Sequence, residues 1–593
     1  MARAPSAAKV AAAAGRRTAG ALERRRYGPW RLLRANLYDL GLLLRESRVA
    51  LGGFVVVVLA GTLYLRQHFG LRFLQALYEA LQLLIFQNSR PLPTDWPGEV
   101  VFFLLPLLGL ALIVQSVLSF GRRLLDKGSR GESWQVALAS TYRDHLILCG
   151  LGRVGLRVLT RLLEAGYEVV VIERDWKTRF VARALALRVP VIAGDAREAT
   201  VLRQAGLKHA RALVAGINGD LLNIEIALAA RTARPEVRVI LRAFNEELDR
   251  NLERIFGPES TYSSSALAAP TFAAAAVSRN VAYALPVGND LLGVSAVASD
   301  TLGALAATMA QMEERFHVRV LDAPAGGMLT LIGTLEALEA VRLRAAGEGV
   351  ALPPQHPTVE LDRVIVCGLG KVGYRVAQRL HALDPRPQIV VVHREDDSES
   401  LAHHLTPLEG IETVVGDARD VEVLRRAGLD RAYAVAAVTS DDLVNLQVAL
   451  AARRAQPGVH VVVRVFSDAL AEELNSVFEI HTTYSTSNLA SGTLAAAAVL
   501  GGVRHAFAVR GQLFAADDLA VRHGDGLSGL RLGDLRATHG AIGLWLRRAG
   551  EAAVLLPPAE VTLAPGDTLT IVATLAALGR LRERAAASMS AGR

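Results

Sequence analysis

Cysteine, aromatic residues and metal-binding clusters are scarce in this chain of 593 residues. The only two cysteines are Cys149 and Cys367, which excludes a disulfide-stabilised fold of the secreted type. Each cysteine ends a predicted strand at the same place in a repeat, so we expect both to be small buried residues in a reducing compartment. No zinc-type Cys/His spacing is present. Aromatic residues make up 5% of the chain and apolar residues 51%, so the cores must be built mainly from Ala, Val and Leu.

Acidic residues are scarce at the N-terminus, where residues 1–48 contain eleven Lys/Arg and three Asp/Glu. A basic run of this kind is compatible with nucleic-acid binding. Here it lies directly before a long apolar segment, and the positive-inside rule of membrane proteins explains it more simply. We therefore expect no nucleic-acid partner. Residues 1–48 are predicted to be a basic cytoplasmic segment with a helix lying on the membrane surface.

Charged residues are absent from two long apolar segments, residues 49–65 and 100–120. A hydrocarbon core of about 30 Å needs about 20 such residues in a helix, so the sequence predicts two transmembrane helices and the lipid bilayer as a partner. Lys and Arg are concentrated before the first and after the second, which places both termini on the cytoplasmic side of the plasma (inner) membrane. Between them, residues 73–86 have a helical pattern but contain Glu79 and are too short to cross. A re-entrant pore helix and an interfacial helix both fit this segment.

A buried strand running into a glycine-rich turn and then an amphipathic helix occurs twice. The pattern G-x-G-x-x-G in this context is the phosphate-cradling turn of a dinucleotide-binding unit. The first glycine permits the tight turn, the second lets backbone N–H groups approach phosphate, and the third allows close packing of helix on strand. The candidate ligand-binding residues are Gly150, Gly152, Arg153, Val154 and Gly155 in the first copy, and Gly368, Gly370, Lys371, Val372 and Gly373 in the second.

The repeat extends far beyond the glycines. Asn223 returns as Asn445, Arg242 as Arg464, and the run Thr261-Tyr-Ser as Thr483-Tyr-Ser. Strand and helix patterns alternate through each copy, which predicts a parallel, doubly wound sheet. Each copy is followed by a smaller unit, and the first of these units is shorter than the second.

Charged residues at the strand ends suggest the type of nucleotide. The second predicted strand of the first copy ends at Glu173, followed by Arg174. A carboxylate there accepts hydrogen bonds from both ribose hydroxyls and repels a 2′-phosphate, which favours NAD(H), ATP or ADP over NADP. The second copy has His393 at the aligned position, so we expect it to bind more weakly, to bind another ligand, or to be structural.

Two aspartates, Asp195 (followed by Ala196) and Asp417, end the third predicted strands. Contact with the ligand and capping of the next helix are equally compatible with these positions.

These motifs closely resemble those of the regulator-of-potassium-conductance (RCK) family, also called TrkA-type nucleotide-binding domains. The resemblance covers about residues 143–585, and residues 524–583 are similar to the C-terminal ligand-binding subdomain (TrkA-C) of that family. With two membrane spans in front, it implies a prokaryotic two-span potassium channel. It further implies a homotetramer with an eight-domain cytoplasmic ring, in which a nucleotide ligand controls passage of a monovalent cation.

The predicted fold class is an α-helical membrane domain of two transmembrane helices plus a re-entrant helix, followed by two α/β Rossmann-type doubly wound domains. Each Rossmann domain carries a small α+β C-terminal subdomain. The predicted ranges are 1–48 for the basic N-terminus, 49–121 for the pore-like membrane domain, 143–290 and 291–346 for the first Rossmann domain and its shortened subdomain, 347–360 for a linker, and 361–510 and 511–586 for the second pair.

Glycine is absent between Gly70 and Gly98, where channels of this family carry a Thr-x-Gly-Tyr-Gly type filter. Backbone carbonyls must line such a filter, and glycine adopts the required angles freely. The residues present instead, which are our pore-lining candidates, are Gln87, Asn88, Ser89 and Arg90. Arg90 would place positive charge near the mouth of a cation pore.

Three classes of function follow from these patterns. The first is a ligand-gated cation channel. The second is a non-conducting, membrane-anchored nucleotide sensor or regulatory subunit of another ion transporter. The third is an NAD-dependent dehydrogenase, but no catalytic domain or acid/base pair is recognisable, and glycine motifs alone do not make an enzyme. We therefore predict that the chain is not an enzyme and has no metal site.

Overall fold

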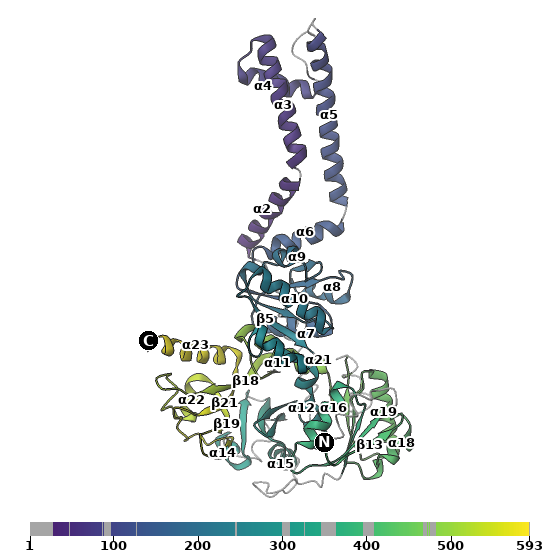
Figure 1. Ribbon diagram of the computed structural model, residues 1–593, viewed down its shortest axis with the longest axis vertical. Helices are drawn as coiled ribbons and strands as arrows, with labels where there is room; N and C mark the ends of the chain where they lie inside the picture. Colours follow the sequence, from purple (N-terminus) through teal and green to yellow (C-terminus); the bar gives the residue numbers. More distant parts are fainter. Residues whose placement is uncertain are drawn as a thin grey trace.

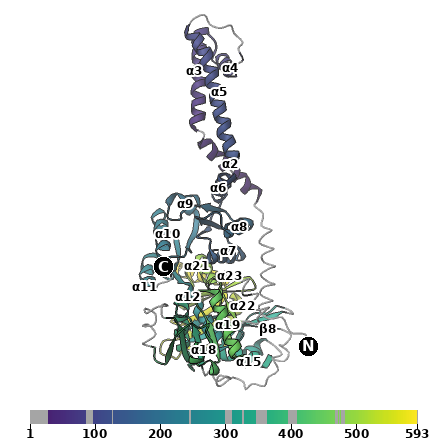
Figure 2. The same ribbon diagram turned by 90° about the vertical axis from the view of Figure 1, so that its right-hand side faces the viewer.

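The computed structural model describes residues 28–46, 48–85, 87, 96–125, 127–243, 246–298, 309–324, 327–345, 363–394, 408–466, 471, 474 and 482–591. A helical stalk stands on the first α/β domain, and the second α/β domain and the smaller sheets lie on the side of that domain away from the stalk (Figure 1). The view turned by 90° shows the same elongated arrangement (Figure 2).

The stalk consists of helices α3 (Arg48–Phe69), α4 (Phe73–Leu84) and α5 (Trp96–Leu125). Helix α4 folds back against both α3 and α5, and it buries a face that includes Ala76, Ala80 and Leu83. Its outer face leaves Leu74 and Tyr78 exposed. A short helix at residues 73–86 was predicted, and α4 confirms it as far as Leu84.

The two predicted membrane spans are not confirmed as single helices. Among the residues that the structure describes, no one helix combines the length and the apolar character that a crossing requires. Helices Gly52–Phe69 and Phe73–Leu84 meet that requirement only together, and they are bent by 120° at the break between them. In α5 the apolar stretch found is Glu99–Ala111, which is too short. The two-span membrane domain therefore stays a prediction.

Several sequence predictions concern residues outside the described ranges or at their edge. Asn88, Ser89 and Arg90 lie outside the described residues, as do residues 1–27 and the predicted linker 347–360. Gln87 is described: it is exposed just after α4, and its backbone N–H donates to Gln82.

Helices α2 (Pro29–Glu46) and α6 (Lys127–Ala139) connect the stalk to the first α/β domain. They pack against each other, and α6 also packs on strand β3 (Val191–Ala193). Arg31 of α2 forms two hydrogen bonds with Glu168, of 2.5 and 3.1 Å, and its guanidinium lies 4.5 Å from the ring centroid of Tyr142. The helix before the stalk and the helix after it are thus both attached to the same domain.

The first α/β domain is a six-stranded parallel sheet with the order β3-β2-β1-β4-β5-β6. This is the strand order of a dinucleotide-binding doubly wound fold. The central strand β1 is buried along its whole length, because helices cover both faces of the sheet. The elements are β1 (His145–Cys149), α7 (Arg153–Glu164), β2 (Val169–Glu173), α8 (Arg179–Ala186), β3, α9 (Ala199–Gln204), β4 (Ala210–Ala215), α10 (Asp220–Ala233), β5 (Arg238–Ala243), α11 (Glu246–Phe256) and β6 (Thr261–Ser263).

The second α/β domain repeats this sheet in the order β13-β12-β11-β14-β15-β16. The two Rossmann-type sheets predicted from the alternating pattern are confirmed. The elements are β11 (Arg363–Cys367), α16 (Lys371–His381), β12 (Gln388–His393), β13 (Ile411–Val415), α18 (Val421–Arg426), β14 (Ala434–Ala437), α19 (Asp442–Ala455), β15 (His460–Arg464) and β16 (Thr483–Tyr484).

An antiparallel sheet follows each parallel one, and each begins earlier than the boundaries predicted at 291 and 511. The first, in the order β7-β8-β10-β9, starts at Tyr283, and the second, β17-β18-β21-β19-β20, starts at His505. Their strands are β7 (Tyr283–Val287), β8 (Asp290–Ala298), β9 (Val318–Asp322) and β10 (Met328–Thr334), and β17 (His505–Val509), β18 (Gln512–Ala520), β19 (Ile542–Arg547), β20 (Val554–Leu555) and β21 (Thr568–Thr574). Most of the shortening lies in the β9–β10 connection, whose described residues include no counterpart of β20.

Two long apolar helices, α12 (Ser264–Val277) and α21 (Thr486–Leu500), cross between the halves of the molecule. Helix α12 of the first half packs on α16 of the second, and α21 of the second half packs on α7 of the first. Both helices are buried on nearly all sides, since they also pack on each other. The halves therefore share their hydrophobic cores.

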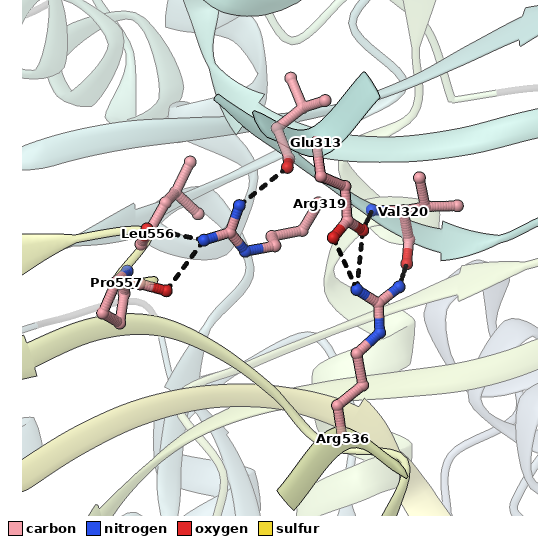
Figure 3. A network of polar contacts seen from close by, with 7 residues as sticks. Glu313, Arg319, Val320, Arg536, Leu556 and Pro557 are labelled. Atoms are coloured by element: carbon pink, nitrogen blue, oxygen red, sulfur yellow. Dashed lines mark hydrogen bonds and ion pairs between the residues drawn. The ribbon is translucent and has the colours of Figure 1, made fainter. Parts of the chain in front are cut away.

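The two small sheets are also joined by a polar network in which helices α14 (Met309–Phe316) and α22 (Leu532–His539) take part (Figure 3). Arg536 donates to both carboxylate oxygens of Glu313, at 2.7 and 2.8 Å, and to the carbonyl of Val320 at 2.9 Å. In return, Arg319 donates to the carbonyls of Leu556 and Pro557. These contacts fix the small sheets relative to each other.

Candidate functional site

The glycine turns have the geometry that phosphate binding requires. Gly150 and Gly368 have φ of +92° and +105°, a left-handed conformation that favours glycine. A Cβ at Gly155 would clash with the carbonyl oxygen of Gly150, so the third glycine brings the helix close to the strand. By contrast, a Cβ at Gly152 would meet nothing within 4 Å. Gly152 and its counterpart Gly370 begin α7 and α16 with no side chain capping the helix.

Glu173 lies at the end of β2, beside the first turn. Its Oε2 accepts a hydrogen bond of 2.6 Å from the backbone N–H of Leu151, and its Oε1 accepts one of 3.0 Å from Asp175. The sheet register pairs Ile172 with Cys149 and Val392 with Cys367, so His393 occupies the position that Glu173 has in the first domain. The predicted equivalence of these two residues is confirmed.

Asp195 and Asp417 are not helix caps. Glu198 and Asp420 occupy the N-cap positions of α9 and α18. Each of the two aspartates instead accepts from the backbone N–H and the guanidinium of the arginine two residues ahead, Arg197 or Arg419. These hydrogen bonds lower the pKa of both carboxyls to about 2. The aspartates are therefore ionised at neutral pH.

The two glycine turns open into one cavity of about 710 Å³ between the halves. The first domain contributes its turn, Glu173 and the loops after β3 and β4, and the second domain contributes its turn, the loop after β14 and the end of β15. Of our predicted ligand-binding residues, those that line the cavity are Gly150, Gly152, Arg153, Val154, Glu173, Arg174, Asp195, Ala196, Gly368, Gly370, Lys371 and Val372. Gly155 and Gly373 pack behind the turns, and His393 and Asp417 do not line the cavity.

Positive charge predominates in the cavity. Six of its lining residues are basic, against Glu173 and Asp195. Arg464 is partly buried, and it donates hydrogen bonds to the carbonyls of Val438 and Thr439, at 3.3 and 3.1 Å, while its Nε is buried without a partner. Burial lowers the pKa of Arg464 to about 10, which still leaves it protonated at neutral pH. Arg464 thus adds a positive charge to the cavity lining.

Phe466 lines the cavity, and two guanidinium groups lie near its ring. The Arg464 guanidinium is 4.7 Å and the Arg153 guanidinium 5.3 Å from its ring centroid. Arg153 comes from the first domain and Phe466 from the second, so this contact crosses the interface. An aromatic ring beside a phosphate-type turn offers a surface for a flat ligand group.

The sequence analysis assigned no role to Arg242, Arg464, Phe466 or the serines that start α12 and α21. The signal was present, because the runs that contain them recur in both copies. Asn223 and Asn445 explain a further part of the repeat: both are fully buried, and each bridges the loop after the fourth strand to the carbonyl of Arg242 or Arg464. They position the two arginines at the cavity.

Comparison with known families gives a match over both parallel sheets. The TrkA-N domain profile matches residues 146–259 and 364–485. This chain contains two TrkA-N domains. They correspond to the two parallel sheets, with one glycine turn in each TrkA-N domain. The resemblance of residues 524–583 to the TrkA-C subdomain stays a prediction.

Similar proteins to this tandem TrkA-N chain include potassium transport proteins. A Trk system potassium uptake protein TrkA homolog of Archaeoglobus fulgidus is 26% identical over 318 residues, which are 51% of this chain and 70% of that protein. The probable potassium channel protein 2 of Methanocaldococcus jannaschii is 28% identical over 119 residues, 19% of this chain and 33% of that protein. The Archaeoglobus protein is an exception in this respect. This chain spans only a fifth to a third of the length of the other four among the first five relatives.

Among solved structures, the GsuK channel has a similar fold. It aligns with a TM-score of 0.50 and 18% sequence identity over 93% of this chain and 100% of that chain. The chain thus has two TrkA-N domains, sequence similarity to potassium channel proteins over part of their length, and a fold similar to that of the GsuK channel.

Proposed function

We propose that this protein is a ligand-gated membrane protein of the potassium-channel type, whose tandem TrkA-N domains bind an adenine nucleotide and thereby regulate cation conductance. The observation that carries the proposal is the cavity, where two glycine turns, Glu173 and the partly buried Arg464 converge. Backbone N–H groups at a helix N-terminus bind phosphate oxygens, and the helix dipole favours the negative charge. The chemistry of the cavity suits a ligand with phosphate groups and a ribose.

The ligand class is NAD(H) or an adenine nucleotide such as ATP or ADP. Glu173 presents a carboxylate at the ribose end of the cavity, where a 2′-phosphate would be repelled. We assign binding and regulation to these residues and no catalytic role, so the protein is not an enzyme in this proposal.

Coupling to the membrane would run through α2 and α6. Both ends of the stalk are attached to the first TrkA-N domain, through the packing of α6 on β3 and the Arg31–Glu168 ion pair. A change of shape in that domain on ligand binding is therefore passed to α3 and α5. In this proposal the stalk lies in the plasma membrane with both termini cytoplasmic, and four chains form a homotetramer with an eight-domain ring around a path for monovalent cations.

A second candidate function is a non-conducting nucleotide sensor, anchored in the membrane, that regulates another ion transporter. It is favoured by one feature of the sequence, the lack of glycine between Gly70 and Gly98. Without glycine a narrow filter of backbone carbonyls is difficult to build.

Reconstitution into liposomes tests both candidates. The full chain is reconstituted into liposomes that enclose a potassium-sensitive dye, and NAD, ATP and ADP are added in turn. We expect a nucleotide-dependent cation flux, and we expect Glu173→Ala to reduce it. Flux that ignores every nucleotide contradicts the gating proposal. Nucleotide binding without flux contradicts conduction and supports the sensor.

A further inference from the structure

One position of the repeat differs between the two TrkA-N domains at the place where the stalk is attached. The first strand begins with His145 in the first domain and with Arg363 in the second. We propose that His145 is a proton-sensitive residue that controls the attachment of α2, because its protonated ring competes with Arg31 for the carboxylate of Glu168. The inference rests on the proposed coupling through α2 and adds pH as a second input to it.

The second domain shows what a cation at this position binds. Arg363 pairs with Gln388 in the sheet, and its guanidinium donates two hydrogen bonds, of 3.0 and 3.3 Å, to the side-chain oxygen of Gln388. The first sheet has the same register, so His145 and Glu168 are the corresponding residues. A positive charge on His145 therefore lies next to a carboxylate, at the position where Arg363 binds a neutral amide.

His145 is completely buried and binds a backbone carbonyl. Its Nε2 lies 2.9 Å from the carbonyl oxygen of Ala205, and Arg363 donates to the corresponding carbonyl of Ala427 at 3.2 Å. Since a carbonyl oxygen only accepts, Nε2 carries the proton of the neutral ring. Nδ1, which is buried without a hydrogen-bond partner among the described residues, is therefore the atom that takes up a second proton.

In the first domain the stalk occupies Glu168 instead. The carboxylate accepts hydrogen bonds of 2.5 and 3.1 Å from Arg31 of α2. The guanidinium of Arg31 also lies 4.5 Å from the ring centroid of Tyr142, and that ring is 5.9 Å from the ring of His145 in an edge-on arrangement. His145 thus lies directly behind the contact that attaches α2 to the domain.

The charged and titratable groups near His145 come from each neighbouring element. Both carboxylate oxygens of Asp144 accept from Arg211, so Glu168 is the acid for which a protonated His145 competes. The complete set is Arg31 of α2, Tyr142, Arg143 and Asp144 before β1, Glu168 before β2, Lys208 and His209 of the short helix η1 (Leu207–His209), Arg211 of β4 and Arg234 after α10.

Protonation of His145 is unfavourable while α2 is attached. Burial lowers the pKa of His145, and Arg143 and His209 lower it further, whereas the hydrogen bond to Ala205 and the charge of Glu168 raise it. A histidine in water has a pKa of about 6.5. The junction with its neutral ring is therefore stable above about pH 6.5, and this stability is lost as the pH falls from there towards the lowered pKa. Acidification thus favours the release of α2.

Hydrogen–deuterium exchange of α2 in the full-length protein in detergent tests the proposal. Isolated helices are marginally stable in water, so α2 exchanges faster once it leaves the domain. The unmodified protein is compared with His145→Gln, with His145→Arg and with the control His209→Gln, which replaces an exposed histidine of the same region. All three changes lie outside α2. The α2 peptide therefore has the same intrinsic exchange rate in each protein, and the ratio between proteins reports the attachment alone.

We expect equal exchange of α2 in the unmodified protein and in His145→Gln at about pH 8, above the pKa of a free histidine. At about pH 5.5 the unmodified protein should exchange several-fold faster in α2 than His145→Gln, because only the unmodified protein gains the proton. His145→Arg carries the charge permanently, as Arg363 does, and its α2 should exchange fast at both pH values. His209→Gln should behave like the unmodified protein.

Equal exchange of α2 in the unmodified protein and in His145→Gln at both pH values would overturn the inference, and so would slow exchange in His145→Arg. Thermal unfolding establishes that each variant folds. Should His145→Gln not fold, Glu168→Gln replaces it: its α2 should exchange faster than that of the unmodified protein at about pH 8, and the difference should disappear at about pH 5.5. A difference that persists at the lower pH contradicts competition for Glu168.

The exchange measurement does not depend on ion flux. Absence of nucleotide-dependent flux in liposomes would therefore refute the proposed function alone, whereas exchange of α2 without the expected pH dependence would refute only the role of His145.

Discussion

Glu173 and Leu151 are connected by a hydrogen bond of 2.6 Å from the backbone N–H of Leu151 to the carboxylate. The acid at the end of β2 thus stabilises the first glycine turn, and it lines the cavity at the same time. A carboxylate accepts several hydrogen bonds, so the one to Leu151 leaves acceptor sites for ribose hydroxyls.

The first prediction concerns this carboxylate. Glu173→Ala is expected to reduce the affinity for NAD or ADP by ~1.5–3 kcal/mol, roughly ten- to a hundredfold, because a charged acceptor is lost. Calorimetry on the full chain measures the effect. Glu412→Gln is the control, since Glu412 is an exposed acid of the second domain. Unchanged affinity in the alanine variant, or tighter binding of NADP than of NAD, would show that Glu173 does not contact the ribose.

The second prediction concerns a reciprocal pair of contacts between the halves. Arg375 of α16 donates to Ser265 and, at 2.7 Å, to Ser263, and Arg157 of α7 donates to Ser485 and Ser487. Arg375 is only 8% exposed. We expect Arg375→Met to lower the free energy of unfolding by ~1–3 kcal/mol, because buried hydroxyl groups lose a charged donor.

Thermal unfolding in detergent measures the effect of Arg375→Met. The control is Arg425→Met, which removes an exposed ion pair with Glu422 and should cost no more than about 1 kcal/mol. Equal shifts in the two variants would mean that the buried contact contributes little to joining the halves.

The third prediction is a dependence of stability on pH. His460 begins β15, and its Nε2 lies 2.8 Å from the carbonyl oxygen of Ala275 in α12. Burial lowers the pKa of His460 to about 4. In the unfolded chain the pKa of a histidine is about 6.5, so the unfolded state binds more protons between these values. Stability should therefore fall as the pH drops from about 6.5 to about 4, by up to about 3 kcal/mol for this group.

His460→Gln keeps a donor for Ala275 and removes the titration. Its unfolding temperature should fall less steeply with pH than that of the unmodified protein. Part of the slope should remain, because burial also lowers the pKa of His505 to about 3. Replacement of the exposed His523 by Gln is the control. An identical slope in His460→Gln would contradict this prediction.

The fourth prediction concerns ion selectivity. If the protein conducts, it should discriminate weakly between potassium and sodium, because residues 87–93 contain no glycine and other residues adopt left-handed angles at a cost of about 1–2 kcal/mol each. Pro91 and Pro93 further restrict the backbone. Bilayer recordings under opposed potassium and sodium gradients decide this. A reversal potential close to that of potassium would mean that an unfamiliar sequence builds a selective filter.

Local sequence patterns predict much of the fold. The alternation of apolar strands with amphipathic helices predicts both parallel sheets, and the G-x-G-x-x-G turns are located to the residue. These features depend on neighbours a few positions apart, so a period and a turn motif suffice to find them. The alignment of Glu173 with His393 follows in the same way from the repeat.

Other predictions failed where the sequence gives two options. The capping role considered for Asp195 and Asp417 is wrong, because each forms a turn with the following arginine instead. The antiparallel sheets begin at Tyr283 and His505, before the predicted boundaries at 291 and 511, because β7 pairs with β8 and β17 with β18. Which neighbours a strand pairs with is decided by hydrogen bonds to distant strands.

The sequence by itself thus determined two dinucleotide-type turns, their duplication and the acid in the first copy. Only the tertiary structure decided that both turns line one cavity and that Arg464 and Phe466 of the second domain line it as well. The reason lies in α12 and α21, which are apolar on nearly every side. The sequence shows that such helices are buried, but it does not show which elements they pack against. Their exchange joins residues as far apart as Arg157 and Ser487, a relationship that no local pattern contains.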